Sequence, residues 1–141
     1  MAPYILIAED DEDDRLLLMS AFQESKMSEK IIFVTNGVEV LQHFAKIETE
    51  NLLPFPALLI LDLNMPKVNG KQVLSELNLK SYFHDFSTVI FSTTSCENEM
   101  QNCMDLGISK YFVKPTGYKA LLDVVNQFCA LAGFTKVDSA K

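Results

Sequence analysis

The stretch LLILDLNMPKVNG, residues 58–70, decides the fold because an uninterrupted apolar run ends abruptly at an acid. Aliphatic runs without polar alternation are typical of strands covered on both faces in parallel sheets. Asn64, Pro66 and Gly70 break the run before the apolar spacing of a helix begins. The stretch therefore predicts a strand, a loop and a helix, with Asp62 at the carboxyl end of the strand.

Apolar segments of this kind alternate with helical patterns along the whole chain. The predicted strands are Tyr4 to Ala8, Ile31 to Thr35, Ala57 to Leu61, Thr88 to Phe91 and Tyr111 to Val113. The predicted helices are one with Leu17, Leu18, Ala21 and Phe22, one from about Gly37 to Ile47 with the apolar stripe Val38, Leu41, Phe44 and Ala45, one that begins with Val73, Leu74 and Leu77, one before Gly107 with Met100, Cys103 and Met104, and one from Tyr118 to Ala132 whose apolar stripe begins with Tyr118, Leu121 and Leu122. Five alternations predict an α/β fold, a five-stranded parallel sheet with right-handed crossovers and helices on both faces. Residues 49–56 are predicted to form a loop.

The length and composition favour one soluble, cytoplasmic domain. At 141 residues the chain can bury one substantial core, and we expect a domain over residues 1–134 with a short C-terminal tail, 135–141. No apolar run approaches the roughly 20 residues of a membrane span. The first apolar segment lacks a preceding basic region and a small-residue cleavage site, so it is interpreted as a strand and not as a signal peptide.

The charge and the cysteines exclude further classes of function. A net charge of −7, without a local Lys/Arg cluster, removes the electrostatic attraction that nucleic-acid binding needs. Cys96, Cys103 and Cys129 form no CxxC pair, which favours reduced thiols, with Cys103 and Cys129 in the core. His43 and His84 lack a surrounding motif and are predicted to be surface residues.

Six consecutive acids, EDDEDD at residues 9–14, follow the first strand. The later four fit the first turn of a helix, where each meets the helix dipole favourably by about 0.3–1 kcal/mol. Glu9 and Asp10 instead end the strand and are predicted to face Asp62 at the sheet edge where ligands bind. Crowded carboxylates raise a pKa or recruit a cation, and an all-oxygen donor set favours Mg²⁺.

A nucleophilic carboxylate beside a metal indicates phosphoryl transfer, since aspartate can carry an acyl phosphate. Such chemistry also needs a fixed cation and hydrogen-bond donors at the phosphoryl oxygens. Lys114 ends the last strand in YFVKP and is the candidate cation. Ser92 and Thr93, in FSTTS at the end of the fourth strand, are the candidate hydroxyls.

These residues closely resemble the receiver domain of two-component response regulators. The resemblance is carried by ILIAEDD, LDLNMPKVNG, VIFSTTS and YFVKP, in that order, and spans about Tyr4 to Ala132. It implies the strand order 2-1-3-4-5 of the flavodoxin-like receiver fold. The long segment from Glu48 to Pro56, with the STTS cluster, looks similar to single-domain regulators associated with phytochrome-type histidine kinases.

The resemblance also implies a role for each site residue. Asp62 would be the phosphoacceptor. The Mg²⁺ ligands would be Glu9, Asp10, Asp62 and the backbone carbonyl of Asn64. Lys114 would contact the phosphoryl group together with Ser92 or Thr93, Ser92 and Tyr111 would form the conformational switch, and Pro115 would follow a cis peptide bond. The side chains of Asn64 and Thr94 would influence access of water to the acyl phosphate.

The partners implied are a histidine kinase or histidine phosphotransfer protein upstream and a further protein downstream. The chain would be a signalling phosphoacceptor and not an enzyme acting on other substrates. Its output would pass through protein contacts at the face of the fourth helix, fifth strand and fifth helix, through phosphate relay, or through a homodimer. No nucleic-acid or membrane partner is expected.

Three alternatives remain open from the residues. A phosphatase of the haloacid-dehalogenase type also uses a strand-end aspartate, but its second acid would stand where this chain has Asn64. A flavodoxin-like FMN carrier shares the topology, but six acids after the first strand would repel the phosphate. A receiver that has lost phosphorylation and acts only as a scaffold would keep the fold without the chemistry.

Overall fold

The computed structural model describes residues 3–51 and 53–134. The predicted tail at 135–141 lies outside these residues. Along the chain the elements are β1 (Ile5–Ala8), α1 (Glu12–Glu24), the short 3-10 helix η1 (Ser28–Lys30), β2 (Ile31–Val34), α2 (Gly37–Glu50), β3 (Leu58–Leu61), α3 (Gly70–Asn78), η2 (Ser81–Asp85), β4 (Ser87–Ser92), α4 (Glu97–Asp105), β5 (Lys110–Val113) and α5 (Tyr118–Leu131).

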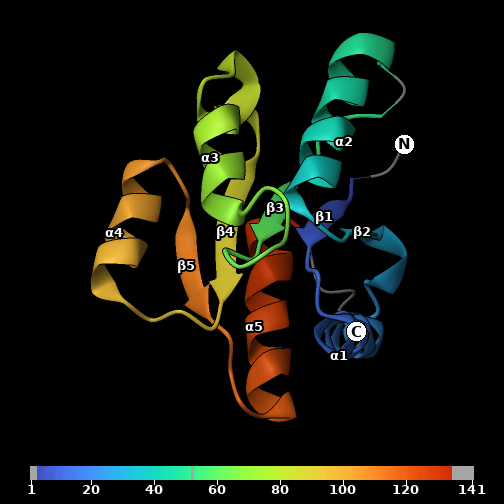
Figure 1. Cartoon of the computed structure of the whole chain (residues 1–141). Coiled ribbons are helices and arrows are strands. Elements are labelled where there is room, and N and C mark those ends of the chain that lie inside the picture. The colour runs from blue at the N-terminus through green and yellow to red at the C-terminus, as the bar shows by residue number, and fades with distance from the viewer. Residues whose placement is uncertain (1–2, 52, 135–141) are drawn as a thin grey trace.

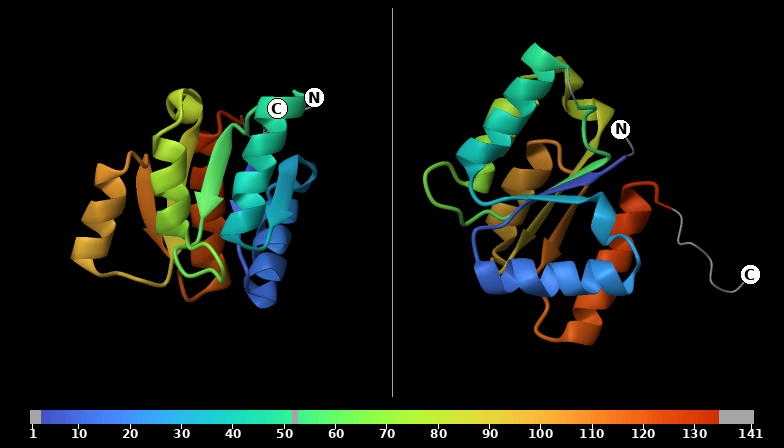
Figure 2. Two further views of the ribbon diagram at one scale, coloured as in Figure 1. Left: turned by 45° about the horizontal axis from the view of Figure 1, so that its top comes forward. Right: turned by 90° about the vertical axis from the view of Figure 1, so that its right-hand side faces the viewer.

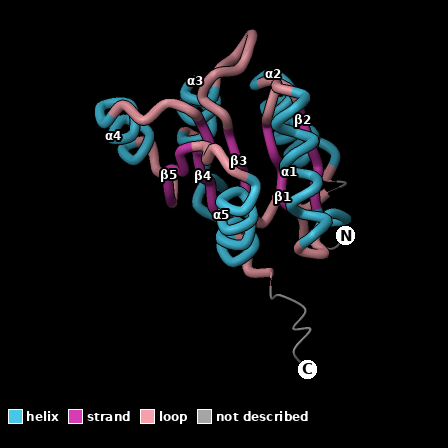
Figure 3. Tube along the Cα trace, turned by 90° about the horizontal axis from the view of Figure 1, so that it is seen from below, coloured by secondary structure: helices cyan, strands magenta, loops and turns pink. Residues whose placement is uncertain are grey.

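The described strands form one parallel sheet in the order β2-β1-β3-β4-β5, as expected (Figure 1). Helices α1 and α5 cover one face, while α2, α3 and α4 cover the other (Figure 2). The view from below shows α5 on one side of the strands and α3 on the other (Figure 3). Strands β1 and β3 are buried on both faces, which explains their continuous aliphatic sequences.

The caps of two helices hold the segments that surround the sheet edge. Asp11 is the N-cap of α1, where its side chain accepts a hydrogen bond from the Asp14 amide, and three further acids occupy the first turn. Asn69 and Gln72 form a capping box at the start of α3. The later four acids thus lie at the start of α1, as predicted, with Asp11 as the N-cap and the other three in the first turn.

Some predicted helical details are wrong. Helix α2 continues to Glu50, so the first two residues of the predicted 49–56 loop are helical. Leu17, Met104 and Tyr118 were placed on apolar faces, but they are 48%, 45% and 39% exposed. In α1 the buried face is made by Leu18 and its neighbours one turn later, because only one side of a consecutive leucine run can face the sheet.

An aromatic cluster closes the end of the sheet opposite to the acids. The rings of Phe44, Phe55, Tyr82 and Phe86 stack, with centroids 4.5 Å apart for Phe55 and Tyr82. These contacts join α2, the segment before β3 and η2. The cluster fixes the amino-terminal ends of the strands and leaves the opposite edge to the functional groups.

His43 is half-buried beside this cluster and is not the isolated surface residue that was predicted. Its Nε2 atom lies 2.8 Å from the Tyr4 hydroxyl, which also donates to the Pro54 carbonyl at 2.7 Å. Burial lowers the pKa of the His43 ring, and the nearby Lys46 ammonium lowers it further. The folded protein therefore favours the neutral ring.

This environment predicts a pH-dependent contribution to stability. Below the ordinary histidine pKa of about 6.5 the unfolded chain takes up a proton that the folded chain resists, so the contribution is present above that pH and lost as the pH falls. Between pH 7.5 and 5.5, wild type is expected to lose roughly 0.5 kcal/mol more unfolding free energy than His43→Gln, because solvent screens the half-exposed ring. Urea unfolding of both proteins measures this difference. Equal pH dependence in the two proteins would contradict the assignment.

Among the described residues, no helix combines the length and the apolar character needed to cross a membrane.

Candidate functional site

The carboxyl ends of four neighbouring strands place the predicted site residues at one edge of the sheet. Strands β1 and β3 pair with Ala8 opposite Leu61, so the residues that follow them, Glu9 and Asp62, leave the sheet side by side. Ser92 ends β4, and Lys114 directly follows β5. The parallel topology therefore brings together groups that are far apart in the sequence.

Three carboxylates converge at this edge. Glu9, Asp10 and Asp62 each offer an oxygen, and these atoms lie within 4.8 Å of one another. Glu9 and Asp62 are only 1% and 5% exposed, whereas Asp10 is exposed. A compact set of carboxylate oxygens that is open on one side suits a hard divalent cation that keeps some of its waters. The donor set therefore fits the expected Mg²⁺.

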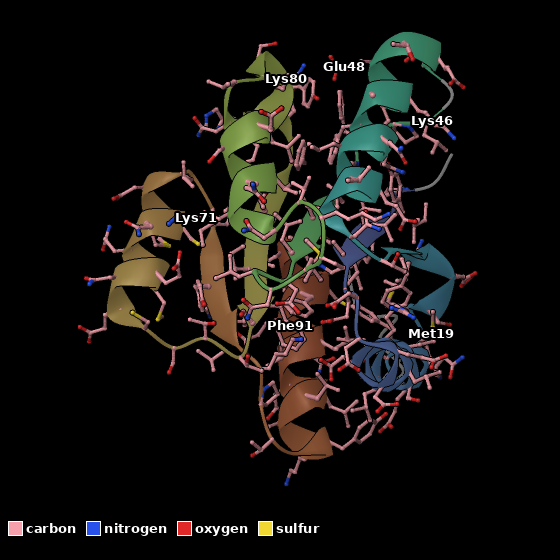
Figure 4. All side chains as sticks on the ribbon, viewed as in Figure 1. Met19, Lys46, Glu48, Lys71, Lys80 and Phe91 are labelled. Atoms are coloured by element: carbon pink, nitrogen blue, oxygen red, sulfur yellow. The ribbon has the colours of Figure 1, made fainter. Side chains whose placement is uncertain are left out.

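Lys114 is the cation of the site. Its Nζ atom lies 2.8 Å from Glu9 Oε1, 2.7 Å from Asp14 Oδ2 and 3.0 Å from Asp62 Oδ2. It also lies 5.7 Å from the centroid of the Phe91 ring. Phe91 is the last residue but one of β4 and is labelled in Figure 4. The ammonium is thus held against the side chain of Asp62 from several directions.

The two charges of this cluster respond differently to burial. Burial raises the pKa of Glu9 to about 7, the negative charge of Asp62 adds to this, and the hydrogen bond from Lys114 opposes it. Burial alone would lower the pKa of Lys114, but its hydrogen bonds to Asp14, Glu9 and Asp62 outweigh that effect and raise it. The lysine is therefore held in its charged form.

Two residues in the site were missed by the sequence reasoning. Asp14 was assigned only to the helix dipole, yet it accepts the 2.7 Å hydrogen bond from Lys114. The Nη1 atom of Arg15 donates to the backbone carbonyls of Glu9 and Asp10, each at 2.9 Å. The only sequence signal was their position one turn after the strand-end acids, at the start of a helix.

The loop after β3 packs tightly under Asp62. The Asn64 amide donates to Asp62 Oδ1 at 3.0 Å, and the Gly70 amide donates to the Leu63 carbonyl at 3.1 Å. A Cβ atom on Gly70 would lie 2.3 Å from the Asp62 carbonyl oxygen. The Met65 side chain is buried in the core beneath this loop. The position of Asp62 is therefore fixed by backbone contacts.

The loop after β4 carries the candidate hydroxyls. Ser92 is fully buried and its Oγ atom accepts from the Thr94 amide at 3.3 Å, whereas Thr93 is exposed. The Tyr111 hydroxyl donates to the Thr94 carbonyl at 2.6 Å. The Asn64 Nδ2 atom lies 3.5 Å from Thr94 Oγ1. The loop is thus tied both to β5 and to the loop after β3.

The cis peptide bond implied before Pro115 is not found. The described residues contain no cis peptide bond, so the Lys114–Pro115 bond is trans. For a bond that precedes proline the two isomers differ by only about 0.5–1 kcal/mol, and the trans form still places Lys114 against Asp62.

Comparison with known proteins agrees with this geometry. The family model for the response regulator receiver domain matches residues 5–126. The chain belongs to this family. The receiver fold therefore accounts for the sheet order. The family match excludes the phosphatase and flavin-carrier alternatives.

Individual relatives are similar to this receiver over most of its length. Response regulator Rcp1 of Synechocystis sp. is 26% identical over 121 residues, which cover 86% of this chain and 82% of the relative. The probable methanogenesis regulatory protein FilR2 of Methanothrix harundinacea is 24% identical over 123 residues, covering 87% and 79%.

Solved structures show the same fold. A phosphorylated cyanobacterial phytochrome response regulator, RcpA, superposes with a TM-score of 0.82 at 23% identity, covering 100% of this receiver and 98% of that chain. The Mn²⁺-bound form of Rcp1 superposes with a TM-score of 0.78 at 26% identity, covering 92% and 93%. The related receiver Rcp1 thus binds a divalent cation, and this receiver carries the acidic triad Glu9, Asp10 and Asp62.

Proposed function

We propose that this receiver accepts a phosphoryl group on Asp62 from the phosphohistidine of a histidine kinase or phosphotransfer protein. The observation that carries the proposal is the Lys114 ammonium, 3.0 Å from Asp62 Oδ2, beside the acidic triad. A buried strand-end carboxylate with its own cation has the nucleophile and the charge stabilisation that phosphoryl transfer needs. The likeness to phytochrome response regulators favours a kinase of that class as the donor.

The transfer forms one bond and breaks another. A carboxylate oxygen of Asp62 attacks phosphorus in line, the P–N bond to the donor histidine breaks, and its electron pair stays on the imidazole. Lys114 follows the phosphoryl oxygens as charge shifts toward Asp62, exchanging carboxylate contacts for phosphoryl contacts. A bound Mg²⁺, held by Glu9, Asp10, Asp62 and the Asn64 carbonyl, would supply further positive charge at those oxygens.

We also propose that the switch acts through the loop after β4. Ser92 is buried at the strand end, which favours it over the exposed Thr93 as the hydroxyl that turns toward the phosphoryl group. Movement of Ser92 would change the position of Tyr111, because Ser92 Oγ accepts a hydrogen bond from the Thr94 amide and the Tyr111 hydroxyl donates one to the Thr94 carbonyl. The charge added to Asp62 would thus shift the balance between two arrangements of this loop.

The output face proposed is that of α4, β5 and α5. Each of these elements carries a large apolar side chain that is at least 39% exposed, namely Met104, Val113 and Tyr118. Exposed apolar side chains are available to a downstream protein or a second copy of this chain. The same loop that contacts Asn64 leads directly into α4, so a change at the site is transmitted to this face.

The phosphorylation proposal is tested with wild type and Asp62→Ala. Each protein is incubated with acetyl phosphate or phosphoramidate, with Mg²⁺ or with a chelator, and its intact mass is measured. We expect wild type to gain one phosphoryl group only with Mg²⁺, and Asp62→Ala to gain none, because the nucleophile is absent. Asp105→Ala, which removes an aspartate at the end of α4, should behave as wild type.

No mass gain in wild type with either small donor, nor with a histidine phosphotransfer protein, would contradict the proposal. The protein would then be interpreted as a receiver that keeps the fold and acts only as a scaffold.

A further inference from the structure

An ion pair connects α3 and α4 near the phosphorylation site. Lys71, the second residue of α3, places its Nζ atom 3.2 Å from Oε1 of Glu99 in the first turn of α4. In Figure 4 the Lys71 side chain lies between these two helices. Both helices begin directly after the loops that flank Asp62, so the pair links the two sides of the site.

The pair closes one side of a small cavity. The cavity has a volume of about 130 Å³ and is lined by Leu63, Asn64, Asn69, Lys71, Thr94 and Glu99. At about 30 Å³ for each water, it can hold roughly four. Its wall includes Asn64, whose amide donates to Asp62, and Thr94, whose hydroxyl lies 3.5 Å from the Asn64 side chain. Water in this cavity therefore lies next to the loops that surround the phosphoacceptor.

The carboxylate of Glu99 depends on this lysine. Its Oε1 atom is buried and has no hydrogen-bond partner among the described residues. The Lys71 ammonium is its ionic partner there, at ion-pair distance without hydrogen-bond geometry. A buried carboxylate oxygen without a cation must be hydrated. Loss of the pair would therefore draw the start of α4 outward and admit water between the helices.

We propose that the Lys71–Glu99 ion pair restricts access of water to the acyl phosphate and so lengthens the lifetime of the phosphorylated receiver. This inference rests on the proposed phosphorylation of Asp62. In the hydrolysis a water oxygen forms a bond to phosphorus, the bond from phosphorus to the Asp62 oxygen breaks, and the water proton leaves with inorganic phosphate. The carboxylate of Asp62 is regenerated. The ion pair acts on the approach of water and takes no part in the bond changes.

The test compares dephosphorylation rates of wild type, Lys71→Gln and Glu99→Gln. Each protein is phosphorylated with phosphoramidate and Mg²⁺, the donor is removed, and the loss of the phosphorylated mass is followed with time. Ion pairs between partly exposed side chains are weak, so we expect each variant to dephosphorylate about two- to fivefold faster. The two substitutions change the local charge in opposite directions. Faster dephosphorylation in both variants would therefore be caused by loss of the ion pair and not by a change in the electrostatic field at Asp62.

A second pair in the same protein supplies a matched control. Lys80 and Glu48 lie 3.6 Å apart between α2 and η2, with side-chain exposures of 48% and 36%, against 45% and 34% for Lys71 and Glu99. This second pair lies away from the loops that flank Asp62 (Figure 4). Lys80→Gln should leave the dephosphorylation rate unchanged. The exchanged double variant Lys71→Glu/Glu99→Lys should restore a rate close to that of wild type.

Each outcome separates the two proposals. If wild type, Lys71→Gln and Glu99→Gln all become phosphorylated and then dephosphorylate at the same rate, the proposed role of the ion pair is wrong. The proposed phosphorylation of Asp62 would still stand. Rate changes of opposite sign in the two single variants would replace it with an effect of local charge. Failure of wild type to gain a phosphoryl group would instead reject the proposed function.

Discussion

Lys114→Ala is expected to slow the phosphorylation of Asp62 by about 100- to 1000-fold. Removal of one preorganised group that stabilises developing charge typically has an effect of this size. Lys114 is the one cation that the described residues place at ion-pair distance from Asp62, so no neighbour can replace it. The rate is measured as accumulation of the phosphorylated mass with acetyl phosphate at saturating Mg²⁺.

The same substitution should lower the free energy of unfolding by about 3 kcal/mol, because it leaves the buried Glu9 and Asp62 without their cation. Lys110→Ala is the control, since that lysine begins β5, the strand that Lys114 follows, but contacts Gln127 and the Phe112 ring. It should leave the phosphorylation rate within about twofold of wild type. A Lys114→Ala rate equal to that of Lys110→Ala would refute the role assigned to Lys114.

The strands could be predicted because buried strands have continuous apolar sequences. A strand such as β3, covered by helices on both faces, has apolar residues at every position, and its end is marked where Asp62 follows Leu61. The convergence of Glu9 and Asp62 then follows from parallel topology alone. The residues at the carboxyl ends of neighbouring strands must meet at one edge.

The helical faces were harder to predict. In α2 the predicted stripe was Val38, Leu41, Phe44 and Ala45, of which only Phe44 is buried; the other buried side chains of the helix are Val40 and Ile47. Apolar residues that lie on adjacent positions of a helix fit more than one stripe, and packing against the sheet selects among them. A pattern read from one sequence does not contain that selection.

The ion pairs of the site depend on tertiary contacts across long separations. Asp14 meets Lys114 because the first turn of α1 and the residue after β5 both lie at the carboxyl edge of the sheet, and Lys71 meets Glu99 because α3 and α4 start from adjacent loops. Neither partner carries a local signal. Such residues are identified only when the packing of the helices on the sheet is known.

Gly70→Ala should destabilise the protein strongly, although it adds only one methyl group. Its Cβ would lie 2.3 Å from the Asp62 carbonyl oxygen and 3.0 Å from the Leu63 Cα, and both are backbone atoms that cannot rotate away. The loop after β3 must therefore shift. Overpacking of this kind costs about 3 kcal/mol, and the shift would also move Asp62 away from Lys114. We expect a lower midpoint in urea and phosphorylation at least tenfold slower, since small misplacements of reacting groups have large effects.

Gly117→Ala gives the comparison that isolates the steric cause. Gly117 is the N-cap of α5, and a Cβ there would meet no atom within 4 Å. The loss of an N-cap glycine costs only a fraction of the capping energy, so its stability should change by less than about 1 kcal/mol and its phosphorylation rate should stay near wild type. Because both variants add one methyl group at the start of a helix, a large loss of stability and phosphorylation rate in Gly70→Ala alone would show that close backbone approach fixes the position of Asp62. Similar effects in both variants would show that helix propensity, and not the contact with Asp62, explains the effect of replacing Gly70.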